Sequence, residues 1–529
     1  MAKRYSGIRT AGIVAGAILF GRIIGLLREL TLASLFGAGR SMDAFLTAFR
    51  TPNLLRDLFA EGALSTTFIT LFSRKVAKEG KKSAWLLASR VIMWVTTFMS
   101  TIVLLGIIGA QPIVGMLAPG FPEHKAQLTI LLCRIMFPFI LLVSLAALVM
   151  GMLNVSNVFG IPAIASSFFN LGFVGGGVFL SWLLDPSFGE RSLVGLAIGV
   201  LIGGALQLII QLPSLQRAGF SFYLVRTCQW HRDPDLRAIL KLMAPATLAA
   251  SAVQVNVMVN TIFASWLEDG TISWLTCAFR LMQFPLGVFG VAVATVTLPA
   301  VSRLAADRKI TLLRETLARA MRLSVFLTLP SAVGLIFLAT PIVSLVYQHG
   351  KFGLDDTLHT AIALQLYALG LVSYSCIKVL FPAFYALGCK WEPAFVSLLS
   401  IGLNLLLNWL LTFQFGLGYR GLALSTALSA CFNFVALYCR MRPYIGGLES
   451  LQFVSTVLRT LVSALAMAIA CWGLTHLGSG WISSPHLWVR GVSLLTIVCA
   501  AALFYLGTCR VLRMEEICSV YTYLRATYS

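Results

Sequence analysis

The chain consists largely of apolar runs of membrane-spanning length, separated by short polar or charged segments. A transmembrane helix needs about 20 predominantly apolar residues. Counted against this length, the sequence predicts fourteen transmembrane helices and an all-α polytopic membrane protein. The predicted spans are 9–36, 43–72, 84–110, 127–153, 160–184, 192–213, 238–267, 272–301, 315–347, 358–387, 393–414, 420–440, 455–477 and 487–510.

The segments between these spans alternate in charge. One set is rich in lysine and arginine, and the other is rich in glycine, proline and acidic residues. Lysine and arginine number about 25 on the first side and about five on the second, an excess typical of cytoplasmic loops. Both termini are therefore expected in the cytoplasm, in agreement with an even number of spans. The basic set comprises the N-terminus, 73–82, 213–241, 303–322, Arg440 with Arg442, and the tail; the other set comprises 119–125, 185–191, 268–270, 348–356 and 478–486.

Short sequence echoes at offsets of 226 to 231 residues, in one order along the chain, indicate an internal duplication. Each copy would hold six helices and insert the same way up, which predicts two six-helix lobes related by a pseudo-two-fold axis along the membrane normal. The predicted lobes are 1–220 and 221–445, and 446–529 adds a C-terminal helix pair and a cytoplasmic tail. The alternative is chance similarity among apolar segments. The echoes pair Ala48-Phe49-Arg50 with Ala278-Phe279-Arg280, Ser73-Arg74 with Ser302-Arg303, Pro162-Ala163 with Pro393-Ala394, and Gly195-Leu196-Ala197 with Gly421-Leu422-Ala423.

Composition narrows the function. Only 11% of the 529 residues are charged and 58% are hydrophobic, whereas soluble domains carry roughly 25% charged residues. The net charge of +20 follows the loops and forms no aromatic-interleaved basic domain, so no nucleic-acid partner is expected. The histidines and cysteines show no HExxH or CxxC spacing, and we expect neither a metal nor a disulfide framework. No Walker motif or catalytic triad appears, so we expect a carrier without a cofactor and not an enzyme.

Charges inside the first two spans are the strongest functional signal. A charge at the bilayer centre costs about 2.5–3.5 kcal/mol on insertion scales, so these side chains must be hidden from lipid, as in a wet cavity or a site for a charged ligand. The alternative is a set of buried structural ion pairs. The charges are Arg22, Arg28 and Glu29 in the first span and Asp43, Arg50, Arg56, Asp57 and Glu61 in the second.

Helical geometry groups these charges, because positions seven or eleven apart share a face. Arg22 and Glu29 are seven apart, as are Asp43 and Arg50, and Arg50 and Glu61 are eleven apart. Pro52 is expected to interrupt the second helix. In the first helix, Gly21 and Gly25 form a small-xxx-small pair that lets another helix approach closely.

The second half holds fewer such groups. Arg280 stands out in an apolar run, and Asn404 and Asn408, four apart, are neighbours on one helix face. With Asn256, Asn260 and Thr426, these asparagines could coordinate a monovalent cation or form interhelical hydrogen bonds. Because an arginine guanidinium binds phosphate bidentately, an arginine-lined cavity suits a phosphorylated or pyrophosphorylated substrate.

Several segments resemble the MurJ/MviN lipid II flippases of the multidrug/oligosaccharidyl-lipid/polysaccharide exporter superfamily. The resemblance rests first on two opening segments, RIIGLLRELTLASLFGAG and DAFLTAFRTPNLLRDLFAEGALSTTFITLFSR. It extends over the chain through FRLMQFPLGVFGVAVATVTLPAVSR, FPAFYALGCKWEP and GYRGLALSTALSA. The resemblance implies transfer of the undecaprenyl-pyrophosphate-linked peptidoglycan precursor across the bacterial inner membrane by alternating access. The expected partners, besides this substrate, are membrane lipids and the cell-wall synthesis machinery. It also implies two extra helices that shape a lipid groove. Arg28, Glu29 and Arg280 match the family's charged cavity trio, and Arg22, Asp43, Arg50, Arg56 and Glu61 match its other sensitive positions.

The chain departs from the family pattern at two places. Phe279 stands where many members have an aspartate, and the positions that hold sodium through aspartates in some members correspond to Asn260 and Asn408. These asparagines argue against sodium coupling, and membrane potential is the alternative drive. A cation-coupled drug or polysaccharide-lipid exporter and a non-transporting scaffold remain competing functions. The net basic first two spans argue against a drug exporter for cations, and the buried charges argue against a scaffold.

Overall fold

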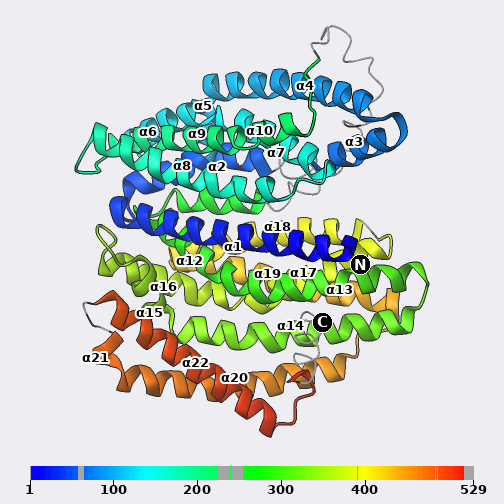
Figure 1. Cartoon of the computed structure of the whole chain (residues 1–529). Coiled ribbons are helices and arrows are strands. Elements are labelled where there is room, and N and C mark those ends of the chain that lie inside the picture. Colours follow the sequence, from blue (N-terminus) through cyan, green and yellow to red (C-terminus); the bar gives the residue numbers. More distant parts are fainter. Residues whose placement is uncertain are drawn as a thin grey trace. The chain divides into compact units, whose positions relative to one another are not determined.

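The computed structural model describes residues 2–57, 65–223, 237, 239, 254–389, 391–482, 484 and 486–517, which form helices and connecting turns and contain no strand (Figure 1). The chain forms two compact units, Met1–Ile272 and Ser273–Ser529, which we describe separately. The first unit thus extends past residue 220, because residues 254–270 pack on the helices that precede them. The division into lobes at 220 and 445 stays a prediction.

In the described part of the first unit, ten helices lie between residues 2 and 217, and a further helical segment covers residues 254–264. The helices are α1 (Ala2–Phe36), α2 (Arg40–Leu55), α3 (Ser65–Glu79), α4 (Lys81–Ile108), α5 (Ala110–Leu117), α6 (Glu123–Met136), α7 (Phe139–Val155), α8 (Gly160–Leu184), α9 (Ser192–Ile209) and α10 (Leu212–Arg217).

The second unit contains long helices, several of them interrupted. They are α12 (Thr271–Pro285), η3 (Leu286–Gly290), α13 (Val291–Ala306), α14 (Ile310–Phe337), α15 (Ala339–Tyr347), α16 (Leu354–Ala368), α17 (Leu371–Ala386), α18 (Trp391–Trp409), η4 (Leu410–Gln414), α19 (Tyr419–Ile445), α20 (Ser450–Leu477), α21 (Ser479–Ile482) and α22 (Leu487–Val511).

The described helices support a multi-pass membrane protein. Ten helical stretches are long and apolar enough to cross a membrane, or eleven if α16 and α17, bent by 46° at their junction, form one span. These stretches correspond to predicted spans from 84–110 to 192–213 and from 272–301 to 487–510. The other three predicted spans carry the buried charges or include residues outside the described ranges, so the number fourteen stays a prediction.

Prolines and π-turns mark the interruptions. Pro138 separates α6 from α7, and π-helical η3 directly follows Pro285. A proline removes one intrahelical hydrogen bond and its ring crowds the preceding turn, which bends or breaks a helix. Pro52 behaves differently from our expectation, because it lies inside α2, which continues to Leu55.

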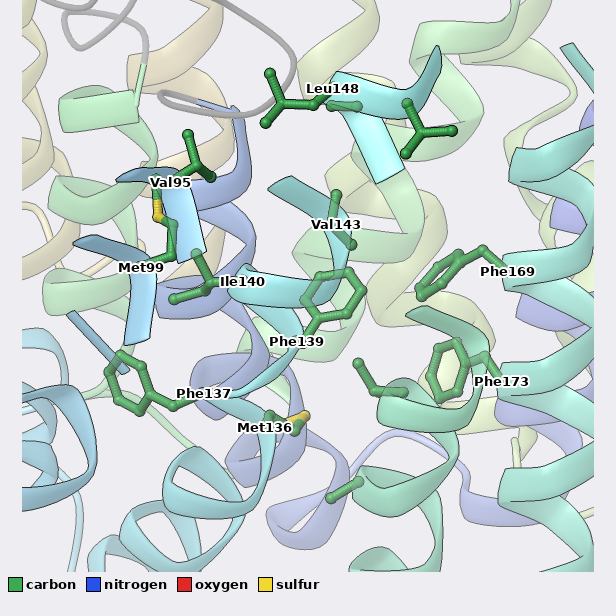
Figure 2. Packing of buried hydrophobic residues seen from close by; sticks show 14 of the residues in the cluster. Val95, Met99, Met136, Phe137, Phe139, Ile140, Val143, Leu148, Phe169 and Phe173 are labelled. Atoms are coloured by element: carbon green, nitrogen blue, oxygen red, sulfur yellow. The ribbon is translucent and has the colours of Figure 1, made fainter. Parts of the chain in front are cut away.

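The core of the first unit comes chiefly from α4 and α7, with further residues from α2, α3, α6, α8 and α9, and it includes a group of packed phenylalanines. Figure 2 shows Phe139 between the residues of α4 and the two α8 phenylalanines, Phe169 and Phe173. The ring centroids of Phe139 and Phe169 are 5.4 Å apart, and those of Phe169 and Phe173 are 5.9 Å apart. Such contacts between fully buried rings are favourable beyond area burial. They hold α8 in place, and α8 in turn carries residues of the candidate site.

Two pairs of consecutive helices, α8 with α9 and α18 with α19, pack through a glycine at corresponding positions of the predicted repeat. A Cβ atom on Gly195 of α9 would lie 2.4 Å from the amide nitrogen of Ser181 in α8, and one on Gly421 of α19 would lie 2.8 Å from the Leu411 carbonyl carbon. Near Gly195, the α8–α9 seam continues with Gly199, whose Cβ would lie 2.3 Å from Gly177 Cα. Glycine at these positions lets the two backbones touch, as in close helix pairs in membranes.

We expect Gly199→Val to lower the free energy of unfolding by about 1–3 kcal/mol, because the new side chain would force α8 and α9 apart. Gly175→Val on α8 is the matched control, because no atom lies within 4 Å of its added Cβ. Thermal unfolding of the purified protein in detergent measures the difference. Equal melting temperatures for the two variants would contradict the predicted backbone contact.

Candidate functional site

The first candidate site lies where α1 meets α8. The predicted small pair on α1 is confirmed: a Cβ on Gly21 would lie 3.1 Å from Ser167 Oγ, and one on Gly25 would lie 3.6 Å from Asn170 Nδ2. The absence of side chains at these positions brings α8 close. Arg28, one turn further along α1, can therefore reach across to α8.

Arg28 is largely buried and only partly satisfied by its neighbours. Its Nη1 donates to Asn170 Oδ1 at 2.8 Å, its Nε donates to Glu29 Oε1 at 3.0 Å, and its guanidinium carbon lies 5.5 Å from the centre of the Phe173 ring. With a second bond to Glu29 from Nη2, three of its five N–H groups have partners among the described residues. The other two are available to an anion. Arg22, two turns earlier on α1, is exposed.

A second cluster binds α2 to α6 through a buried lysine. Lys125 Nζ lies 3.1 Å from Asp43 Oδ2 and 2.7 Å from Asp269 Oδ1, and it lies 4.2 Å from the centre of the Phe121 ring. The Gly270 amide also donates to Asp43 Oδ2, at 2.8 Å. The Lys125 and Asp43 side chains are 3% and 1% exposed. Such burial is tolerable because each charge has an opposite charge and further polar contacts.

The loop residue Asp269 completes this cluster. Burial raises the pKa of Asp269, but the hydrogen bonds and charges of Lys125 and Arg40 outweigh it and bring the pKa below the ordinary value of 3.8. Arg40 Nε donates to Asp269 Oδ2 at 3.1 Å. Asp269 therefore stays ionised at neutral pH, and the contact persists unless the solution is more acidic than that value.

The charges of α2 and of the two residues directly after it form a row that faces residues 254–270. Asp43 accepts from the backbone amide of Gly270. Arg50 Nη1 donates to the Val257 carbonyl at 3.3 Å and to the Thr261 hydroxyl. Asp57 Oδ2 accepts from Gln254 Nε2 at 3.0 Å. The predicted shared face of Asp43 and Arg50 is confirmed, since both contact the same antiparallel segment. Arg56 donates to Asp57 Oδ1 from Nη2 at 2.9 Å. Glu61 lies outside the described residues.

Sequence reasoning missed the partners in these clusters. We placed Lys125 in a polar loop, whereas it lies in the first turn of α6 and is buried. Asn170, Thr261 and Gln254 carry no charge and lie more than 100 residues from the charges they contact. No short-range pattern points to them. The spacing of seven along α2 was the one usable signal, since it showed which face needed partners.

Arg280, the predicted counterpart in the second unit, lies half-buried on α12. It interacts electrostatically with the hydroxyl of buried Tyr347 on α15, which hydrogen-bonds with Cys277. Phe279, at the position where an aspartate is common in the family, packs edge-to-face on Tyr367 of α16 with centroids 5.4 Å apart. Phe279 is therefore a packing residue in this chain.

The predicted cation ligands are placed partly in each unit. In the second unit, Asn408 Nδ2 donates to Asn404 Oδ1 at 3.2 Å, and the Ser425 hydroxyl of α19 donates to Asn408 Oδ1. Thr426 Oγ1 donates to the Leu422 carbonyl at 2.8 Å. Asn260 belongs to the first unit. Of these contacts, the bond between Ser425 and Asn408 joins α19 to α18, and the other two each lie within one helix. A cation site stays a prediction; in the described chain no group of three or more histidine, cysteine or acidic residues is arranged to hold a metal.

We expect Lys125→Met to lower the free energy of unfolding by about 3–5 kcal/mol, because it leaves Asp43 buried without its counter-charge. Asp43→Asn combined with Lys125→Met should recover part of that loss. Lys309→Met is the matched control, since Lys309 forms an exposed pair with Asp307 at 3.3 Å and such pairs contribute little.

Thermal unfolding of the three purified variants in detergent measures these differences. If Lys125→Met melted at the same temperature as Lys309→Met, the contacts of Lys125 with Asp43 and Asp269 would not be stabilising the first unit.

Comparison with known proteins gives a consistent picture. The family model described as "Lipid II flippase MurJ" matches residues 32–491. A protein of Buchnera aphidicola subsp. Acyrthosiphon pisum named probable lipid II flippase MurJ is 36% identical over 466 residues, covering 88% of this chain and 89% of that protein. A solved structure titled "Lipid II flippase MurJ, inward closed conformation" is 27% identical with a TM-score of 0.76, covering 94% of this chain and 99% of the other.

The fold extends to more distant transporters. An inward-facing multidrug resistance MATE family transporter of the MOP superfamily is 13% identical with a TM-score of 0.66, covering 83% of this chain and 99% of that one. At this identity the likeness shows the fold alone. It agrees with a helical membrane architecture.

Proposed function

Because the chain belongs to the MurJ family of lipid II flippases, we propose that it moves lipid II from the inner to the outer leaflet of the bacterial cytoplasmic membrane by alternating access. Lipid II is a lipid-linked peptidoglycan precursor, so this step would serve cell-wall synthesis. The polar head group would cross inside the protein while the prenyl tail stays in lipid. The chain would need no catalytic group, because no bond is made or broken.

We propose the architecture predicted from the sequence as the frame for this movement. It has fourteen helices, two six-helix lobes related by a pseudo-two-fold axis, and two C-terminal helices that shape a groove for the tail. Both termini would face the cytoplasm. The similar roles of Gly195 in α9 and Gly421 in α19 support the duplication, since each brings its helix against the backbone of the preceding one.

We propose that Arg28 and Arg280 contact the pyrophosphate of the substrate. The observation that carries this assignment is the state of Arg28, which is largely buried, oriented by Asn170 and Glu29, and retains two unused N–H groups among the described residues. Arginine N–H groups and phosphate oxygens match in geometry and charge. Glu29 would keep the site from holding the substrate too tightly by compensating part of the positive charge.

The row on α2 would act in the conformational step. In the described arrangement Arg50 and Asp57 hold residues 254–261, so their charges are already in use. Movement of that segment would expose Arg50 and Arg56 to the transported pyrophosphate and restore their contacts afterwards. Arg22, Asp43 and Glu61 would belong to the same functional set as supporting charges.

We expect Arg28→Ala and Arg280→Ala each to weaken substrate binding by about 10- to 100-fold, the loss of a hydrogen bond to a charged group being worth ~1.5–3 kcal/mol. Cells that depend on either variant should accumulate lipid II on the inner leaflet. Arg319→Ala, at an exposed position of α14, is the matched control. Normal growth and normal lipid II distribution with Arg28→Ala at equal protein abundance would overturn the assignment.

We propose that membrane potential, and not a sodium gradient, drives the step, because Asn404 and Asn408 already bond to each other and Asn408 also accepts from Ser425. Replacing sodium by potassium on both sides of reconstituted vesicles should leave the flipping rate unchanged. Imposing a potential should change it, since each charge moved is worth about 2.3 kcal/mol per 100 mV. A rate that responds to sodium at zero potential would instead support the cation site.

A further inference from the structure

A hollow of about 430 Å³ lies at the end of α19. It exists because the chain turns there through Gly446 and Gly447, with φ angles of 67° and 111°. This left-handed backbone favours glycine, and two residues without side chains leave the space open. The hollow is lined by Cys439, Arg442, Pro443, Gly446 and Gly447.

Two arginines bring positive charge to this hollow. Arg442 lines it, and Arg314 of α14 donates from Nη1 to the Gly446 carbonyl at 3.5 Å. The Nε of Arg314 is buried and has no hydrogen-bond partner in the described chain. Arg314 therefore adds positive charge beside the hollow, at the carbonyl of one of its lining residues.

Neighbouring arginines show what these two lack. Arg440 lies 3.5 Å from Glu392 Oε2, and Arg322 Nη1 lies 2.8 Å from Glu449 Oε2. Among the described residues, no carboxylate lies within 4 Å of Arg314 or Arg442. The positive charge at the hollow therefore has no carboxylate partner among the described residues, whereas that of nearby Arg440 and Arg322 has one.

Aromatic residues place this end of the bundle at the membrane surface. Trp391, at the start of α18, is 86% exposed. The hydroxyl of Tyr444 donates to Glu392 Oε1 at 3.2 Å, which puts the start of α18 beside the end of α19. Exposed tryptophan and tyrosine at helix ends are typical of the headgroup level of a bilayer.

An apolar track leads from the hollow along α19. Leu428 and Val435 are 42% and 54% exposed, and their spacing of seven and then four residues to Cys439 keeps all three on one helix face. Arg442 follows three residues later on that face. A cationic hollow continued by an apolar stripe matches a molecule with a phosphate head and an acyl chain.

We propose that the hollow lined by Arg442, with Arg314 beside it, binds the phosphate of an anionic phospholipid headgroup, with an acyl chain along Val435 and Leu428. The Arg442 guanidinium, which lines the hollow, and Nη1 of Arg314, which reaches the carbonyl of the lining residue Gly446, can both donate to phosphate oxygens. Basic pockets between transmembrane helices are known to take such headgroups. The site lies in the second unit and is separate from the residues assigned to the transported substrate.

Cys439 serves as a native reporter, because its exposed thiol lines the hollow. The full-length protein is placed in nanodiscs of phosphatidylcholine, with or without phosphatidylglycerol, and treated with N-ethylmaleimide. Peptide mass spectrometry then follows alkylation at Cys439. We expect phosphatidylglycerol to slow this reaction about fivefold, the effect of about one basic contact to an anionic lipid. Inorganic phosphate added to pure phosphatidylcholine discs should have no effect.

The variants separate a specific site from general surface charge. Arg442→Gln and Arg314→Gln should each abolish the protection, whereas Arg319→Gln removes an exposed positive charge from α14 and should retain it. Arg442 is exposed, so its variant tests the site even if Arg314→Gln is unstable. Protection that survives Arg442→Gln, or that is absent in the wild type, would overturn the proposal.

Two further outcomes are informative. Equal protection by inorganic phosphate in phosphatidylcholine discs would show a free-phosphate site and overturn the lipid assignment. Lipid II flipping by Arg442→Gln, measured after reconstitution into sealed vesicles, should be retained. A loss of protection with normal flipping therefore supports this site independently of the function proposed for Arg28 and Arg280.

Discussion

The cost of placing charge in hydrocarbon is the constraint on which the first unit depends. Along α2 and just past its end at Leu55, Asp43, Arg50 and Asp57 recur at intervals of seven and therefore form one charged row. Residues 254–270 meet this row point by point, through a backbone amide, a carbonyl with a hydroxyl, and a side-chain amide. Because an unpartnered charge would be expensive in lipid, the segment and α2 can separate only where water or another polar group replaces these contacts.

The helix pairs α8–α9 and α18–α19, which both pack through glycine, are held together by different contacts. In α8 and α9 the contact continues through Gly177 and Gly199, so backbone lies against backbone. In α18 and α19 the corresponding stretch contains Asn408 and Ser425, which are fully buried and hydrogen-bonded to each other. Close packing resists any displacement, whereas a hydrogen bond between side chains can be exchanged for one to water. The second pair is therefore better suited to small relative motion.

Much of the helical frame and one face of the site were predictable from the sequence, because both depend on short-range periodicity. Apolar length located the spans, the spacing of Gly21 and Gly25 showed where α1 is approached closely, and the interval between Asp43 and Arg50 showed a shared face. Which residue meets each charge depends on tertiary packing. Lys125 lies 82 residues from Asp43, and a lysine beside a turn is usually solvated. Pro52 likewise lies, buried, within α2, which continues to Leu55.

The contacts of Asp43 also impose an order in time on assembly. The nascent chain presents α2 to the membrane before Lys125, 82 residues later, and well before Gly270, 227 residues later. Until then the carboxylate has neither of these partners, and a buried ion without a partner tends to take up a proton or stay in water. The start of α2 would thus remain near the aqueous boundary during synthesis and settle into its final depth only after α6 arrives. By contrast, α8 and α9 are neighbours in the chain and can join as soon as both have been inserted.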